Sequence, residues 1–190
     1  MHSTRTFIAV NVSHKVRARA ATLIDRLDVS GARVNWVAPS NMHLTIKFLG
    51  DQTDQQLAAV CQAVSAAAGE VPAFDFECHG VGAFPATDRP RTLWIGVRDG
   101  HADLVQLHAA IDRHLADIGI AEDRRAFQPH LTIGRVRSGG AGQAALGELV
   151  GRHHDFLVGA TDVDEVIVYA SHLERSGPTY QVIARAALAG

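Results

Sequence analysis

Apolar residues follow two different spacings along this chain. Short apolar runs, as in residues 6–12 and 92–97, are typical of buried strands. Apolar residues that recur every three or four positions, as in residues 16–27, 57–64 and 104–118, are typical of helices with one buried face. Strands and helices are therefore intermixed, which predicts an α+β or α/β fold.

The tetrapeptide His-Leu-Thr-Ile occurs twice, at residues 43–46 and 130–133. Each half of the chain runs strand, helix, His-Leu-Thr-Ile strand, helix, strand. Ile8 and Ile95 each precede the histidine of their own half by 35 positions. This repetition predicts one domain over residues 1–190 with a bilobal, duplicated α+β fold. Two pseudo-symmetric, intertwined lobes, each with a largely antiparallel sheet and helices, would enclose an active cleft.

Side chains on a strand alternate between its two faces. In the first copy His43 and Thr45 share one face, and in the second copy His130 and Thr132 do the same. The leucines and isoleucines between them point to the other side, into a core. If the two strands meet, the cleft holds two imidazoles and two hydroxyls.

Two imidazoles suit acid–base chemistry near neutral pH, since one can accept a proton while the other donates one. Hydrolysis of a strained cyclic phosphodiester needs that pairing, and threonine hydroxyls can stabilise the charged phosphate oxygens. Such a site requires no metal ion and no cofactor.

Composition adds little to this picture. The 190 residues are 47 % apolar, which is enough for a substantial core, and the net charge of −2 does not indicate a nucleic-acid-binding protein, although a local basic patch can lie within a neutral total. Two cysteines, with no signal sequence or long apolar segment, predict a cytoplasmic protein with reduced thiols.

The segments around the repeat resemble a known family. Paired H-x-T-x motifs are the signature of the 2H phosphoesterases. "HLTIKFLG", "RPRTLWIGV" and "FQPHLTIGRV" are similar to the branch of bacterial and archaeal RNA 2′,3′-cyclic phosphodiesterases, also called 2′-5′ RNA ligases. The resemblance covers residues 5–188. It implies hydrolysis of RNA 2′,3′-cyclic phosphate ends to 2′-phosphates in a cleft between two lobes.

The resemblance also implies roles for individual residues. His43 would donate a proton to the 3′ oxygen, and His130 would accept one from water, although the sequence alone does not say which histidine does which. Thr45 and Thr132 would bind the phosphate. RNA ends, among them tRNA halves or nucleotides, would be the partners, and we expect a monomer that does not contact a membrane.

Four neighbours are further candidates for substrate binding. On a regular strand Lys47 lies on the same face as His43, where it can contact phosphate or remain solvated. On a regular strand Arg135 points to the face opposite His130, unless a bulge at Gly134 redirects it. Arg91 and Trp94 can meet a nucleotide, with core packing as the alternative for Trp94.

Five further histidines, in two groups, predict no metal site. Three lie on one predicted helix, at His101, His108 and His114, but none are three or four positions apart. His153 and His154 are adjacent and diverge. We expect all five on the surface.

Other functions stay open at this point. Sister activities are 2′-5′ ligation of RNA ends and the opening of small cyclic nucleotides. The alternative of a different class is an RNA-end-binding module without catalysis.

Overall fold

One curled antiparallel sheet organises the molecule. The computed structural model describes residues 3–137, 142–174 and 177–190. In this part of the chain nine strands form a sheet with the order β7-β4-β5-β6-β3-β1-β8-β9, and β2 lies beside β6. The strands are β1 (Ser3–Asn11), β2 (Val34–Trp36), β3 (His43–Thr53), β4 (Phe74–Phe84), β5 (Thr92–Val97), β6 (His130–Val136), β7 (Leu157–Val163), β8 (Glu165–Glu174) and β9 (Gly177–Ala187).

The strand order is symmetric about its centre. β3 and β6 meet in the middle, and β1 and β5 flank them. β8 and β4 follow, and β9 and β7 lie at the ends. All pairs between these strands are antiparallel. The predicted α+β, bilobal, pseudo-symmetric fold is therefore confirmed.

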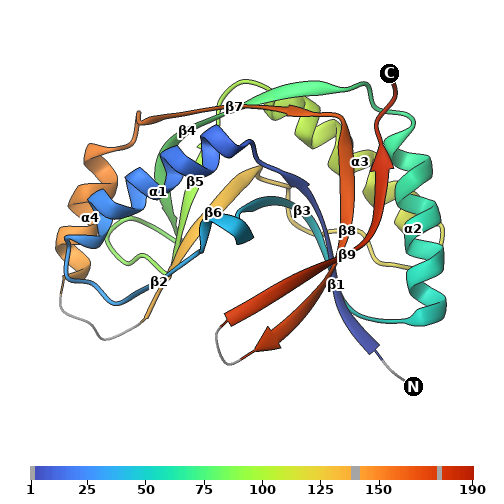
Figure 1. Ribbon diagram of the computed structural model, residues 1–190, viewed down its shortest axis with the longest axis horizontal. Coiled ribbons are helices and arrows are strands. Elements are labelled where there is room, and N and C mark those ends of the chain that lie inside the picture. Colours follow the sequence, from blue (N-terminus) through green and yellow to red (C-terminus); the bar gives the residue numbers. More distant parts are fainter. Residues whose placement is uncertain (1–2, 138–141, 175–176) are drawn as a thin grey trace.

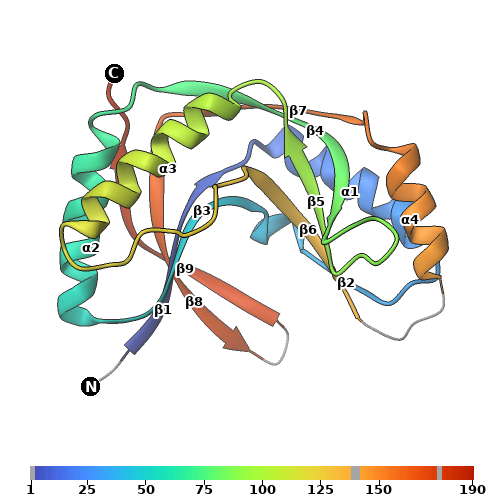
Figure 2. The ribbon, with the colours of Figure 1, turned by 180° about the vertical axis from the view of Figure 1, so that it is seen from behind.

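Helices cover the two ends of the sheet in pairs (Figure 1). They are α1 (His14–Asp28), α2 (Asp54–Ala68), α3 (His101–Ala116) and α4 (Gln143–Arg152), with a short 3-10 helix, η1 (Pro39–Asn41). α1 follows β1 but packs against β7 and α4, at the other end of the sheet. α3 follows β5 but packs against α2 (Figure 2). Each half of the chain thus supplies one helix to the opposite lobe.

Local sequence explains where two helices begin. A serine just before a helical apolar pattern predicts an N-cap, and the Ser13 hydroxyl accepts a hydrogen bond from the Val16 amide at the start of α1. The Thr-x-x-Gln sequence at residues 53–56 predicts a capping box, which Thr53 and Gln56 form at α2. One prediction fails: Ile118 is 41 % exposed, because α3 ends at Ala116 and the chain turns at Gly119 with a φ of 84°.

The two halves differ in strand register. Val10 lies opposite Leu44 in the first half, whereas Ile95 lies opposite Leu131 in the second. The equal 35-residue spacing therefore does not produce equal pairing, and the registers differ by two residues. A shift of two positions keeps every side chain on its face, so the symmetry of the cleft survives.

The sequence predicts a glycine-rich loop at residues 137–142 and a hairpin turn at residues 176–178. Both lie partly outside the described residues, which leave out 138–141 and 175–176. Within the described part, no helix is long and apolar enough to cross a membrane.

Candidate active site

The two His-Leu-Thr-Ile strands meet at a single pair, Leu44 opposite Leu131. Both leucines are fully buried. Opposite residues of an antiparallel pair project to the same face, so the residues on either side of each leucine project to the other face. Those four residues are half-buried: His43, Thr45, His130 and Thr132. The structure thus brings all four predicted site residues to one face at the centre of the sheet.

Each histidine is oriented by the same local contact. His43 Nδ1 lies 2.8 Å from the Asn41 carbonyl oxygen, and His130 Nδ1 lies 2.7 Å from the Gln128 carbonyl oxygen. A carbonyl only accepts, so Nδ1 donates in both cases and carries the proton of the neutral ring. Nε2 is therefore the atom that can accept or release a proton at each histidine.

Aromatic side chains surround both rings. Phe7 stacks on His43 with ring centroids 4.8 Å apart, and Tyr180 meets the same ring edge-on at 5.1 Å. His130 meets Phe84 edge-on at 5.2 Å, with Trp94 at 6.5 Å. These apolar walls limit the rotation of the imidazoles and lower the local dielectric.

The environment of His43 disfavours its charged form. Burial and, to a smaller extent, the positive charge of Arg17 lower its pKa from 6.5 to about 4, against the opposing effect of the Asn41 carbonyl. At neutral pH the free protein therefore holds His43 uncharged. An anionic phosphate beside the ring would favour the imidazolium.

A β-bulge follows the histidine at the same place in both strands. Ala9 and Ile8 pair with Thr45 and Lys47, so Ile46 is the extra residue in β3. In β6 Ile133 is the extra residue, because Trp94 pairs with Thr132 and Leu93 with Gly134. After each bulge, a residue lies on the face opposite to the one that simple alternation from the histidine assigns to it.

The bulge in β3 makes the interpretation of Lys47 wrong. Lys47 is 3 % exposed, so it is neither a phosphate contact in the cleft nor a solvated lysine. Its ammonium donates to Asp112 and, at 3.0 Å, to the Ala121 carbonyl, and lies 3.5 Å from Asp123. The next residue, Phe48, is exposed instead, with its ring 6.1 Å from Phe7.

The bulge in β6 places Arg135 on the same face of the sheet as Thr132, because Arg135 pairs with Thr92 and Thr132 pairs with Trp94, which share one face of β5. Arg135 is exposed and lies opposite Thr92, two residues before Trp94 on β5. Burial raises the pKa of Tyr180, which packs on His43, and the positive charge of Arg135 opposes that rise. Arg135 thus stands close to the cleft face, although the extra residue is Ile133 rather than Gly134.

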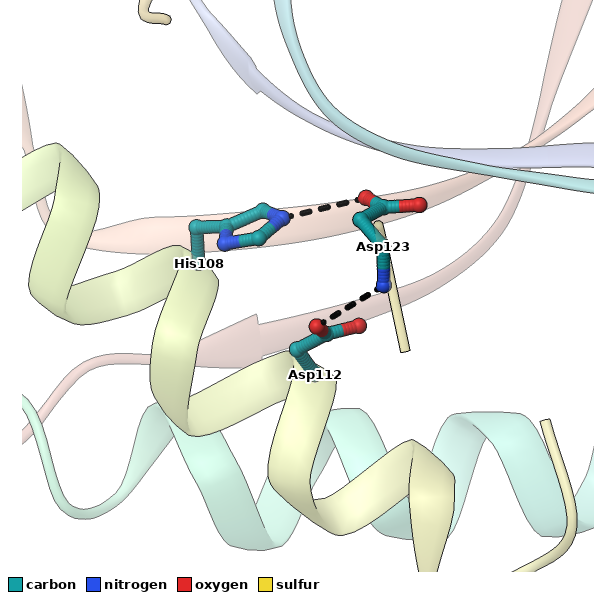
Figure 3. Close-up of side chains that lie close together, drawn as sticks. All are labelled: His108, Asp112 and Asp123. Atoms are coloured by element: carbon teal, nitrogen blue, oxygen red, sulfur yellow. Dashed lines mark hydrogen bonds and ion pairs between the residues drawn. The ribbon is translucent and has the colours of Figure 1, made fainter. Parts of the chain in front are cut away.

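The prediction for His108 is wrong, because this histidine is buried. His108 Nε2 donates to Asp123 at 3.1 Å, and its ring stacks on Phe127 at 4.4 Å. His108, Asp112 and Asp123 have the residue types and proximity of a metal site (Figure 3). The ammonium of Lys47, however, already supplies the positive charge that the two carboxylates require, so we assign no metal here.

The other two candidates lie on β5 or immediately before it. The Arg91 side chain is exposed, while its amide and carbonyl hold it between β4 and β6 through Phe84 and Val136. Trp94 combines both interpretations. Its ring lies flat against Gly82, where a Cβ would come within 2.3 Å, yet it also borders His130.

Of the aromatic residues that surround the histidines, sequence reasoning singled out Trp94 and missed the others, and it also missed Arg17. Phe7, Tyr169 and Phe84 lie on strands, and nothing in their local sequence marks them as part of a site. Arg17 reads as one of several arginines on α1. Pairing between strands far apart in the sequence brings them to the site, and a single chain carries little signal of that pairing.

Comparisons with known proteins agree with this geometry. A model of the 2′-5′ RNA ligase superfamily matches residues 18–174. An RNA 2′,3′-cyclic phosphodiesterase of Aeropyrum pernix is 31 % identical over 165 residues, which cover 87 % of this chain and 92 % of that protein. Its namesake from Thermotoga maritima is 32 % identical over 179 residues, covering 94 % and 92 %.

Solved structures share the fold. TT0787 of Thermus thermophilus superposes with a TM-score of 0.81 over 98 % of both chains at 23 % identity. Escherichia coli LigT in its apo form gives 0.74 over the whole of both chains at 25 % identity. The chain therefore belongs to the 2′-5′ RNA ligase superfamily, and the resemblance to 2H phosphoesterases is confirmed.

Proposed function

We propose that this protein is an RNA 2′,3′-cyclic phosphodiesterase that hydrolyses cyclic phosphate ends to 2′-phosphates by two-histidine acid–base catalysis. The observation that carries the proposal is the arrangement of His43, Thr45, His130 and Thr132 around the Leu44–Leu131 pair. The relatives named RNA 2′,3′-cyclic phosphodiesterase support this substrate.

The two histidines divide the proton transfers. His130 Nε2 accepts the proton of the attacking water as the oxygen bonds to phosphorus. His43 Nε2 gives its proton to the 3′ oxygen as the bond between phosphorus and that oxygen breaks. The products are a 2′-phosphate and a 3′-hydroxyl.

His43 must first gain a proton to act as the donor, because its pKa of about 4 leaves it neutral in the free protein. The bound phosphate supplies the negative charge that raises this pKa. His43 thus becomes an acid only when substrate is present. The buried ring therefore needs the phosphate for its function.

Hydroxyls and a guanidinium complete the proposed site. Thr45 and Thr132 donate hydrogen bonds to the non-bridging phosphate oxygens, whose charge grows in the transition state. Arg135 is the residue on the cleft side best suited to hold an oxygen or a neighbouring phosphate. We propose that the site lies in a single domain of residues 1–190 and uses no metal.

Replacement of either histidine tests the proposal. His43→Ala and His130→Ala should each lower kcat on an RNA with a 2′,3′-cyclic phosphate end by at least about 100-fold, because each removes one proton transfer. Turnover is followed by the appearance of the 2′-phosphate, and circular dichroism checks the fold. EDTA should leave the wild-type rate unchanged.

The results that contradict the proposal are specific. Wild-type kcat in either variant would exclude two-histidine catalysis, and loss of activity with EDTA, restored by a divalent ion, would exclude a metal-free site. Tight binding of RNA ends without turnover would favour a binding module. Joining of paired RNA halves through a 2′-5′ bond, or faster opening of small cyclic nucleotides, would favour one of the sister activities.

A further inference from the structure

A cavity of about 270 Å³ lies between α1 and η1, next to the catalytic face. Its walls are formed by three polar and three small or apolar residues: His14, Arg17, Ser40, Ala18, Ala21 and Pro39. η1 leads directly into His43, since the carbonyl of Asn41 at its end accepts the hydrogen bond from His43 Nδ1. The cavity is therefore one residue removed from the contact that orients His43.

Arg17 brings an uncompensated positive charge to this cavity. Its Nε is buried and has no hydrogen-bond partner, and no carboxylate among the described residues forms an ion pair with its guanidinium. A buried donor without a partner is costly, and arginine is the side chain best suited to bind a phosphate through two parallel hydrogen bonds. The Arg17 guanidinium thus gives this otherwise mainly apolar cavity a group that binds an anion with several acceptor oxygens.

Electrostatics place Arg17 near the reaction centre. Burial lowers the pKa of His43, and the charge of Arg17 lowers it too; burial raises the pKa of Tyr169, and Arg17 opposes that rise. The Tyr169 hydroxyl donates a hydrogen bond to Asn11 at the end of β1. Asn11 in turn lies opposite His43. The guanidinium is therefore close to the His43 end of the cleft.

The cavity and the proposed phosphate contacts lie on different sides of His43 along the chain. Pro39 and Ser40 precede His43, whereas Thr45 follows it on β3. None of the four site residues lines this cavity, so a group bound there by Arg17 is separate from the scissile phosphate that Thr45 and Thr132 bind. In an RNA the neighbouring anion is the next phosphodiester along the strand.

We propose that the cavity between α1 and η1 is a second phosphate subsite, in which Arg17 binds the phosphodiester that joins the terminal nucleotide to the rest of the RNA. This inference rests on the proposed function and narrows its substrate to oligonucleotides in preference to cyclic mononucleotides. Ser40 and His14 add hydrogen-bonding groups beside the guanidinium.

The test compares two substrates that differ by one nucleotide, whose phosphodiester is the group assigned to the subsite. These are adenosine 2′,3′-cyclic phosphate and the dinucleotide ApA with a 2′,3′-cyclic phosphate end. The wild type should have a higher kcat/KM for the dinucleotide, and Arg17→Met should lower the ratio of the two kcat/KM values by about tenfold or more. Arg17→Lys, which keeps the charge but loses the planar fork, should lower it less.

Lys15→Met is the matched control, because it removes the same charge from an exposed position two residues away on α1 that does not line the cavity. This variant should keep the wild-type ratio. An unchanged ratio in Arg17→Met, including an equal loss on both substrates, would overturn the subsite.

A binding measurement separates this inference from the proposed function. ApA without a cyclic phosphate and adenosine are titrated into the wild type and Arg17→Met, with binding followed by calorimetry. The subsite predicts tighter binding of ApA to the wild type only. If the wild type hydrolyses neither cyclic substrate, the proposed function fails while this titration still tests the subsite; equal affinity of the wild type for ApA and adenosine would refute it.

Discussion

His43 and His130 have the same orientation but different surroundings. Both donate Nδ1–H to the carbonyl two residues earlier and leave Nε2 for chemistry. His43 is packed between Phe7 and Tyr180, and its pKa falls to about 4. The two histidines therefore differ because different side chains pack on their rings, and the shared motif does not determine this difference.

The lowered pKa of His43 has a consequence for stability. In the unfolded chain its pKa is near 6.5, so between about pH 6.5 and pH 4 the unfolded state binds a proton that the folded state does not. Stability should therefore fall as the pH is lowered through this range. From pH 7 to pH 4.5 the loss due to His43 should be about 2 kcal/mol.

Urea unfolding of the wild type and His43→Gln at pH 7 and pH 4.5 measures this loss, since the other groups titrate alike in both proteins. The wild type should lose about 2 kcal/mol more than the variant over that interval. His101→Gln, at an exposed position, serves as the control and should follow the wild type. Equal losses in the wild type and His43→Gln would contradict the buried, neutral His43.

At the scale of elements, the segment that leads to His130 is held by a charged cluster. Residues 117–129 contain no helix or strand and are largely exposed. The Lys47 cluster (Lys47, His108, Asp112 and Asp123) contacts this segment at three places. Lys47 donates to the Ala121 carbonyl, Asp112 accepts from the Asp123 amide, and His108 donates to the Asp123 carboxylate and stacks on the Phe127 ring. Phe127 immediately precedes Gln128, whose carbonyl orients His130.

Removal of the Lys47 charge should weaken both the fold and the reaction. Lys47→Met leaves Asp112 partly buried without its main partner, which should cost about 3 kcal/mol of unfolding free energy. It should also lower kcat more than it changes KM, because the segment before His130 loses its anchor. Urea unfolding and steady-state kinetics measure the two effects.

Two further variants make this prediction decisive. Lys47→Met combined with Asp112→Leu removes both charges and should recover part of the lost stability. Lys15→Met, at an exposed position, should change neither quantity. Wild-type stability in Lys47→Met would show that the cluster does not anchor the segment.

At the scale of the whole molecule, the distance between the two histidines depends on how the halves of the sheet join. β3 and β6 share a single residue pair, Leu44 and Leu131, at the centre of the strand order. The exchange of α1 and α3 between the ends of the sheet holds the halves together on both sides (Figure 1). The leucine pair itself lies directly beneath the catalytic face.

A cavity at this junction should disturb catalysis as well as stability. Leu44→Ala or Leu131→Ala should cost about 2–5 kcal/mol, because both side chains are fully buried. Each should also lower kcat by changing the relative position of the histidines. Leu107→Ala, fully buried on α3 away from the junction, should lose similar stability but keep its kcat. Equal kcat values in the junction variants and Leu107→Ala would refute this role.

The sequence by itself predicted the elements and the chemistry of the site. Local patterns sufficed for this: alternation put His43 with Thr45 and His130 with Thr132, and apolar residues at helical spacing marked three of the helices. The repeated motif predicted two similar lobes, each with one His-Leu-Thr-Ile strand, and left open whether the two strands meet. Alternation and helical spacing depend on residues within a few positions of one another, so one chain carries them.

Only the tertiary structure decided what surrounds the motifs. The bulges at Ile46 and Ile133 arise from pairing with β1 and β5, and they send Lys47 into a buried ion pair. Helix exchange brings Arg17 to the cavity beside His43. Strand register, bulges and the burial of charges depend on contacts between residues far apart in the chain, which hydrophobic periodicity does not encode.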